Sequence, residues 1–231
     1  MSIAENVKEI RERIARAAQE SGRNPEDITL VAATKMNDAE RVKEAVLAGI
    51  DVAGENRVQE LMEKYEQGAY EGVPLHFIGT LQTNKVKYLI GKVAMIQSVG
   101  SLKCLAEISR LAKKHDLVQD VLIEVNIGGE ESKSGISAAE LPVFLEEASK
   151  MENIHVRGLM TIPPILGKCE ENSRFFYKMH ELFVDMSAKK YDNINMDFLS
   201  MGMSDDFEEA IRCGANIVRV GTGIFGARHY Q

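Results

Sequence analysis

A lysine at the end of an apolar run is the residue whose type and position best suit covalent chemistry. Lys35 directly follows the run Leu30-Val31-Ala32-Ala33-Thr34, so its amine emerges where a buried strand ends. Partial desolvation lowers the pKa of an ammonium group, and the neutral amine can condense with a carbonyl group to give a Schiff base. A lysine that snorkels from the strand end into solvent is the alternative, and position alone leaves both readings open.

A glycine-rich segment near the end of the chain could hold the anionic part of the same ligand. Residues 221–226, Gly-Thr-Gly-Ile-Phe-Gly, have the G-x-G-x-x-G spacing of a dinucleotide fingerprint, but only five residues follow them. That is too few for the helix, strand and acidic residue which the fingerprint requires. We expect instead a turn whose backbone N–H groups, at Gly221 and Thr222, contact a phosphate. Ser200 and Ser204 would complete this phosphate-binding site, and Ser204 would also cap the next helix. Each loop taken alone is more typical of a tight turn, and it is their position at adjacent strand ends that favours the phosphate site.

Pyridoxal 5′-phosphate (PLP) carries an aldehyde and a phosphate. The aldehyde could react with the Lys35 amine, and the phosphate could bind the glycine-rich turn. Arg219 lies two residues before Gly221 on the same strand, so the two face the same side. Its guanidinium would then reach the pyridine nitrogen of PLP, leave that nitrogen unprotonated and make the ring a weaker electron sink. The alternative is that Arg219 closes the barrel by pairing with Asp197 or Glu124.

Eight short apolar runs alternate with helical patterns and would position these residues. Such runs are typical of parallel strands that are covered on both faces. The alternation predicts an α/β fold, a single (β/α)8 barrel domain over residues 1–231, with an extra N-terminal helix from Ala4 to Ser21 that covers the bottom or one side. A doubly wound open sheet is the alternative. The expected strands are Ile28–Thr34, Asp51–Gly54, Leu75–Gly79, Met95–Val99, Val121–Asn126, Val156–Ile162, Phe198–Met203 and Ile217–Gly221.

The C-terminal ends of the strands form the functional face of such a barrel. Chemically capable side chains from distant parts of the chain follow these strands, and only this topology brings them to one rim without further assumptions. They are Lys35, Glu55, Asn56, Gln82, Asn84, Asn126, Ser200, Ser204 and Thr222.

Composition excludes several classes of function. The chain has 231 residues, 45% of them hydrophobic and 27% charged, as expected of a compact globular protein. A net charge of −7 argues against nucleic-acid binding by bulk electrostatics. Cys104, Cys169 and Cys213 lack the spacing of a zinc site or disulfide framework, so we expect a reducing compartment. No leader or long apolar stretch occurs, which predicts a cytoplasmic protein without a membrane partner.

Several specific segments follow one another from one end of the chain to the other: Val31–Lys35, Gly54–Glu60, His76–Lys85, Ser132–Gly135, Gly158–Ile162, Leu199–Ser204 and Arg219–Gly226. This pattern resembles the YggS/PROSC-type PLP homeostasis proteins, whose fold is that of the alanine racemase N-terminal barrel, the fold type III of PLP proteins. The resemblance implies that PLP is bound as a Schiff base on Lys35 and that Asn56 lies beside its ring. It also implies that Ser200, Ser204, Gly221 and Thr222 surround the phosphate.

The resemblance further implies a carrier that buffers intracellular PLP, without established turnover, with apo PLP-dependent enzymes as recipients. Relatives that racemise amino acids use a second base, a tyrosine on a further C-terminal domain, and this sequence stops at Gln231. A racemase-like enzyme is therefore the second hypothesis. A third is an enzyme that acts on another phosphorylated carbonyl compound through Lys35 without PLP. Lys133 is a candidate alternative amine, although we favour an exposed loop lysine. We expect no metal site, and a monomer or weak dimer.

Overall fold

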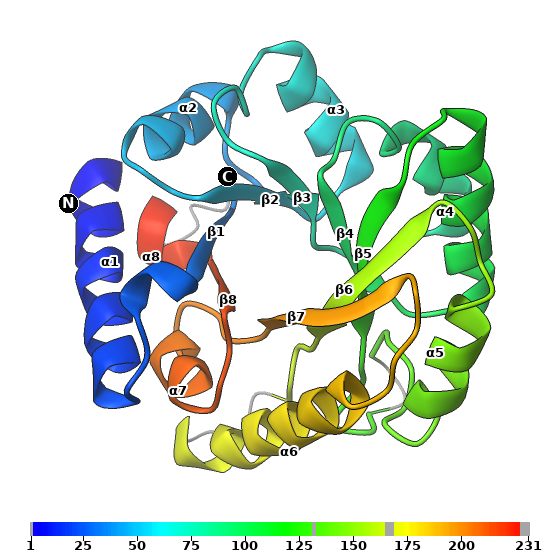
Figure 1. The fold of residues 1–231 in the computed structure, drawn as a ribbon. Coiled ribbons are helices and arrows are strands. Elements are labelled where there is room, and N and C mark those ends of the chain that lie inside the picture. Colours follow the sequence, from blue (N-terminus) through cyan, green and yellow to red (C-terminus); the bar gives the residue numbers. More distant parts are fainter. Residues whose placement is uncertain (1, 131–132, 165–168, 227–231) are drawn as a thin grey trace.

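Eight parallel strands close into a barrel in the computed structural model, which describes residues 2–130, 133–164 and 169–226 (Figure 1). Each strand pairs with the next in sequence, and β1 pairs with β8, where Val31 lies opposite Arg219. The expected barrel is confirmed, and the open-sheet alternative is wrong because the eight described strands close into a ring. The strands are β1 Thr29–Ala33, β2 Val52–Glu55, β3 Leu75–Phe77, β4 Met95–Val99, β5 Gln119–Glu124, β6 Ile154–Met160, β7 Ile194–Ser200 and β8 Ile217–Val220.

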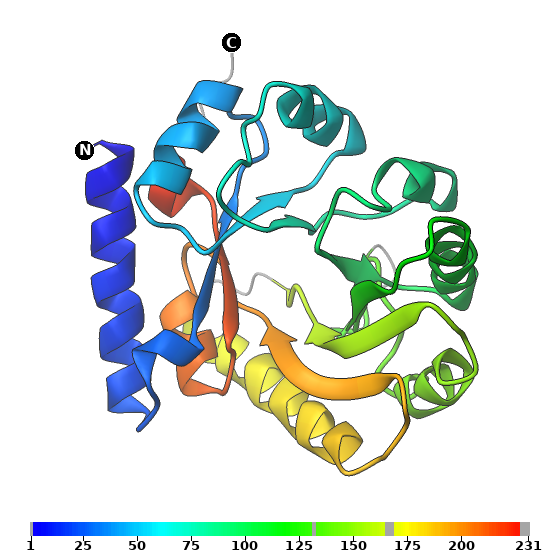
Figure 2. The same ribbon diagram turned by 45° about the horizontal axis from the view of Figure 1, so that its top comes forward.

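Helices surround the barrel (Figures 1 and 2). The N-terminal helix α1 packs against α2, α7 and α8, so it covers one side of the barrel rather than its bottom. None of the described helices is long and apolar enough to cross a membrane. The helices are α1 Ile3–Glu20, α2 Ala39–Leu47, α3 Val58–Glu66, α4 Leu102–Lys114, α5 Leu141–Ala148, α6 Cys169–Ser187, α7 Phe207–Arg212 and α8 Thr222–Phe225, with 3-10 helices η1 Pro25–Asp27 and η2 Thr83–Tyr88.

Strand β7 begins at Ile194, four residues before the predicted start at Phe198. The missed residues are partly polar, and their partners lie on β6. The Asp197 carboxylate accepts a hydrogen bond from Arg157 at 2.7 Å, and Asn195 contacts His155 at 2.8 Å. Such cross-strand polar pairs stabilise a strand without an apolar run, so the sequence pattern alone does not mark it.

Apolar side chains fill both sides of the strands. Inside the barrel lies a small cluster, and a larger core lies between the strands and the helices. Both faces of the strands are therefore covered, which is why they read as continuous apolar runs. Cys104 and Cys213 are buried in the larger core, while the side chain of Cys169 lies outside the described residues. The interior cluster consists of Val31, Val52, Met95, Leu122, Met160 and Ile217.

Candidate functional site

A pocket of about 350 Å³ lies where β1 and β8 end. Lys35 and Ala33 line it from the β1 side, and Gly221 and Thr222 line it from the β8 side. Lys35 is half-buried and Thr222 is exposed, so the pocket communicates with solvent. Because β1 and β8 are neighbours in the closed barrel, the amine and the glycine-rich turn, which are distant in sequence, share one cavity.

Arg41 adds a positive charge to this pocket, and sequence reasoning missed it. Its Nη2 donates a hydrogen bond to the Phe225 carbonyl, and its Nε donates to Asn37 Oδ1 at 3.1 Å. The residue lies in the first turn of α2, where Asp38 caps the helix by accepting the Arg41 N–H. This helix start therefore directs a guanidinium toward the turn after β8, a position suited to an anion.

Ser204 contacts the turn after β8 but does not cap α7, so that part of the prediction is wrong. Its Oγ accepts hydrogen bonds from the N–H groups of Gly221 at 3.1 Å and Gly223 at 3.3 Å. Helix α7 begins after Asp206, whose carboxylate accepts the Met203 N–H at 2.7 Å. The Ser204 hydroxyl thus accepts from two backbone N–H groups that an anionic oxygen could also accept from.

Arg219 points into the barrel interior and is almost fully buried. It donates to the Ser200 hydroxyl and, at 2.8 Å, to the Thr161 carbonyl. Burial lowers the pKa of Arg219 to about 10, and the nearby Glu124 carboxylate opposes that shift, so the guanidinium remains charged at neutral pH. Asp197, the other suggested partner, pairs with Arg157 instead.

Ser200 does not line the pocket that contains Lys35. Its side chain is fully buried, and its hydroxyl donates to Gln97 Oε1 at 2.7 Å while accepting from Arg219. Gln97 Nε2 in turn lies 2.9 Å from His76 Nδ1, and both side chains are buried. The structure therefore places Ser200 in a row of four hydrogen-bonded polar side chains below the mouth of the barrel, where the strands end. This row, here called the interior chain, consists of His76, Gln97, Ser200 and Arg219.

The donors and acceptors that these four side chains carry fix the direction of each hydrogen bond in the interior chain. Arginine can only donate, so the Ser200 proton is available to Gln97 Oε1, which leaves the Gln97 amide to donate to His76 Nδ1. Burial lowers the pKa of His76 to about 4, so the ring is neutral near pH 7 and its Nδ1 can accept. The sequence analysis missed Gln97, which stands next to Ser98 in the buried strand β4.

Asn56 follows β2 at the rim and is half-buried. Its backbone N–H donates to Glu55 Oε2 at 3.0 Å, whereas its buried Oδ1 has no hydrogen-bond partner among the described residues. A buried polar atom without a partner is costly, and a ligand can supply the missing bond. Gly79 packs against the Asn56 backbone so closely that a Cβ there would lie 2.1 Å from the Asn56 carbonyl oxygen.

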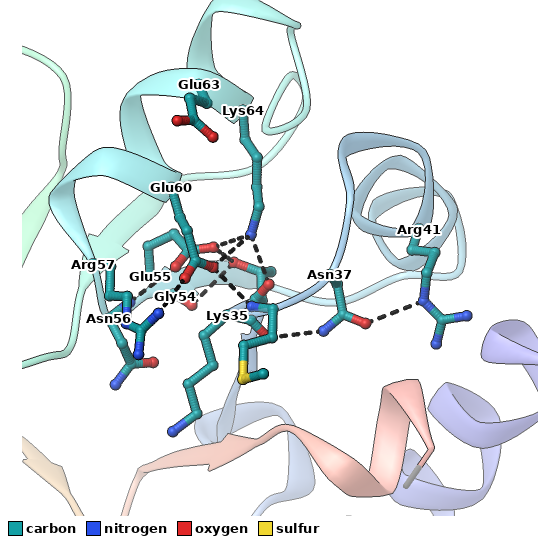
Figure 3. Close-up of polar contacts among 12 residues, drawn as sticks. Lys35, Asn37, Arg41, Gly54, Glu55, Asn56, Arg57, Glu60, Glu63 and Lys64 are labelled. Atoms are coloured by element: carbon teal, nitrogen blue, oxygen red, sulfur yellow. Dashed lines mark hydrogen bonds and ion pairs between the residues drawn. The ribbon is translucent and has the colours of Figure 1, made fainter. Parts of the chain in front are cut away.

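A buried cluster lies behind Lys35, on the side facing α3 (Figure 3). Lys64 Nζ forms an ion pair with Glu55 and donates to the Thr34 carbonyl at 2.8 Å. Thr34 Oγ1 donates to Glu55 Oε1 at 2.8 Å, and Glu55 and Thr34 are fully buried. Sequence reasoning placed Glu55 on the rim but missed Lys64, whose only sequence signal is its spacing of four from Glu60.

Lys133 lines a separate cavity of about 230 Å³ together with Glu124, Thr80 and Ser134. Its ammonium pairs with Glu130 at 2.6 Å and donates to the Pro163 carbonyl at 3.1 Å. It does not line the pocket of Lys35. Among the residues that the structure describes, no cluster of His, Cys, Asp and Glu side chains suits a metal ion.

Comparison with known proteins places this site in a family. The family of the alanine racemase N-terminal domain matches residues 2–229. A pyridoxal phosphate homeostasis protein of Aquifex aeolicus is 45% identical over 230 residues, covering 100% of both chains. The chain belongs to the pyridoxal phosphate homeostasis proteins.

Solved structures agree with this family assignment. PipY of Synechococcus elongatus PCC7942, with PLP bound, is 28% identical, with a TM-score of 0.83 over 97% of this chain and 100% of PipY. An alanine racemase of Clostridium difficile 630 in complex with cycloserine is 18% identical, with a TM-score of 0.68 over 98% of this chain and 61% of the racemase. The second likeness concerns the barrel fold alone.

Proposed function

We propose that this protein binds PLP as a Schiff base on Lys35 and acts in cytoplasmic PLP homeostasis as a carrier. The observation that carries the proposal is the single pocket lined by Lys35, Gly221 and Thr222. It offers an amine at one end and backbone donors at the other, as an aldehyde with a phosphate requires. The family relatives named pyridoxal phosphate homeostasis protein and the PLP-bound structure of PipY support the same ligand.

Each side chain of the pocket has a distinct task in this proposal. Lys35 would hold the aldehyde end of PLP covalently through its amine. The N–H groups of Gly221 and Gly223, which donate to Ser204 in this structure, would hold the phosphate, and Arg41 would supply a positive charge nearby. PLP itself would supply an electrophilic aldehyde and an aromatic ring that withdraws electrons.

Two buried groups fit the ring. Asn56 offers the Oδ1 atom that lacks a partner among the described residues, and it follows β2, next to β1. Arg219 lies within the barrel below the rim and keeps its charge, so it would hydrogen-bond the pyridine nitrogen without protonating it. A ring held in this way stabilises carbanions weakly, which favours storage of the cofactor over racemisation.

The experiment is an absorption and trapping measurement. Wild-type protein incubated with PLP should show the absorption band of a protein-bound Schiff base, and borohydride should attach a reduced pyridoxyl group to Lys35, detected by mass spectrometry of peptides. Lys35→Ala should lose both signals, whereas Lys87→Ala, at an exposed lysine of η2, should keep them. A colourless wild-type protein after incubation would refute the proposal.

Recipients and assembly follow from the same proposal. We expect apo PLP-dependent enzymes to take the cofactor, and the carrier, a single-domain monomer or weak dimer, to need no partner for loading. The exposed Thr222 and half-buried Lys35 leave the ligand accessible to water, which is suited to release. Transfer is measured by adding loaded carrier to an apo-enzyme and following its recovered activity against free PLP at the same concentration.

A further inference from the structure

The two peptide groups beside Lys35 are both held by side chains from α3. On one side, Lys64 Nζ donates to the Thr34 carbonyl at 2.8 Å. On the other side, Glu60 Oε2 accepts the Met36 N–H at 2.8 Å. Glu60 and Lys64 stand one helical turn apart and are themselves 3.6 Å from each other. Figure 3 shows these contacts on one side of Lys35, while the Lys35 side chain extends away from Lys64.

The backbone at this point is one that needs outside support. Met36 has a φ of 60°, in the left-handed region that side chains other than glycine rarely adopt. Strand β1 has already ended at Ala33, so pairing with neighbouring strands no longer fixes the chain beyond the Thr34 N–H, which donates to Gly54. A residue in this conformation persists only where surrounding contacts hold it.

Stability alone does not account for Lys64. Its ammonium is almost fully buried and pairs with Glu55, whose side chain has no exposure. Apolar residues of similar volume in place of a buried ion pair often leave a protein equally or more stable. Lys64 is also unsuited to act as a nucleophile, because two carboxylates and a carbonyl oxygen surround its ammonium.

We propose that Glu60 and Lys64 are positioning residues, which hold the peptide groups on both sides of Lys35 and thereby direct its amine into the pocket. Glu55 anchors Lys64 from below and also accepts hydrogen bonds from Thr34 Oγ1 and the Asn56 N–H. One buried carboxylate thus links the supports of Lys35 and Asn56. The inference rests on the proposed function, because the directed amine matters only if it reacts with an aldehyde.

The test compares variants of Glu60 with and without an oxygen that can accept the Met36 N–H. Glu60→Ala removes the acceptor of the Met36 N–H, whereas Glu60→Gln keeps an oxygen there and serves as the rescue. Glu63→Ala, at an exposed residue of the same helix, is the matched control. Since Lys64→Met alone would leave Glu55 buried without its cation, it is made together with Glu55→Gln, which keeps the buried cluster neutral.

A comparison of two ligands distinguishes an effect on the orientation of the Lys35 amine from an effect on binding of the ring and phosphate. PLP has the aldehyde, and pyridoxine 5′-phosphate has an alcohol in its place, so the second binds through the ring and phosphate but forms no bond with Lys35. We expect Glu60→Ala and the double variant to weaken PLP binding about tenfold, since the freed backbone samples other directions. Pyridoxine 5′-phosphate should bind Glu60→Ala within about twofold of wild type, and Glu60→Gln should behave as wild type.

The outcomes are distinguishable from failure of the proposed function. If wild-type protein forms no borohydride-trapped product on Lys35, the proposed function fails. If wild type forms it and Glu60→Ala binds PLP as tightly, or loses both ligands in parallel, the positioning role is refuted. Circular dichroism and urea unfolding identify a variant that fails to fold, and Glu60→Ala, at a side chain that is 21% exposed, is expected to fold.

Discussion

Acid should destabilise this protein through one buried histidine. Burial lowers the pKa of His76 from 6.5 to about 4, and its Nδ1 accepts a hydrogen bond from Gln97. Between about pH 4 and pH 6.5, His76 is therefore mostly protonated in the unfolded chain and mostly neutral in the folded protein. Stability falls as pH decreases through this window, and the full loss is reached below about pH 4.

The magnitude follows from the two pKa values. Between pH 7 and pH 5, this single group should remove about 2 kcal/mol from the free energy of unfolding. Other groups titrate over the same range, so the measured quantity is a difference between proteins. His76→Asn places an oxygen near the position of Nδ1 and removes the titration, while the small cavity it leaves costs the same at both pH values.

Urea unfolding at pH 7 and pH 5 provides the assay. Wild-type protein should lose about 2 kcal/mol more than His76→Asn over this interval. His115→Asn, at an exposed histidine after α4, should follow the wild type. If wild type and His76→Asn lose stability in parallel, His76 is not held neutral and the order of hydrogen bonds in the interior chain is incorrect.

Two further substitutions test the packing beneath the mouth. Gly79→Ala should destabilise the protein by about 3 kcal/mol, because the new methyl group would overlap the Asn56 backbone. Gly221→Ala should cost under about 1 kcal/mol, because its Cβ would lie 3.5 Å from the Ala33 Cβ. Urea unfolding compares the two variants. Ser200→Ala should cost about 3 kcal/mol by leaving two buried partners unpaired, against a few tenths for Ser149→Ala on the surface, and equal losses would contradict the interior chain.

The fold was predictable because burial on both faces leaves a direct trace in the sequence. Strands covered by helices outside and by side chains inside are mostly apolar, and each such run ends where polar residues reach the rim. Lys35 and Gly221 share a pocket for the same reason, since they follow the first and last strands, which a closed barrel makes neighbours. Strands β5, β6 and β7 begin two to four residues before their predicted starts, and at β7 polar partners on β6 stabilise the added residues.

The polar contacts beneath the site were not predictable in the same way. Gln97, Ser200 and Lys64 find partners on other elements, and those partners depend on strand register and side-chain direction. A pattern along one strand carries no information on either. Ser204 illustrates the difference: its position beside a helix start suggested a cap, but its hydroxyl bonds the turn after β8.

The two buried polar systems support the site from different directions. The interior chain holds Arg219 from within the barrel, and the cluster of Glu55, Glu60 and Lys64 holds the backbone around Lys35 from the side of α3. The groups they support lie at the mouth, where Lys35 is only half-buried. Rigid supports below an accessible mouth fix the geometry of the amine without enclosing a ligand. Such an arrangement favours a site that binds its ligand with defined orientation and still lets it leave.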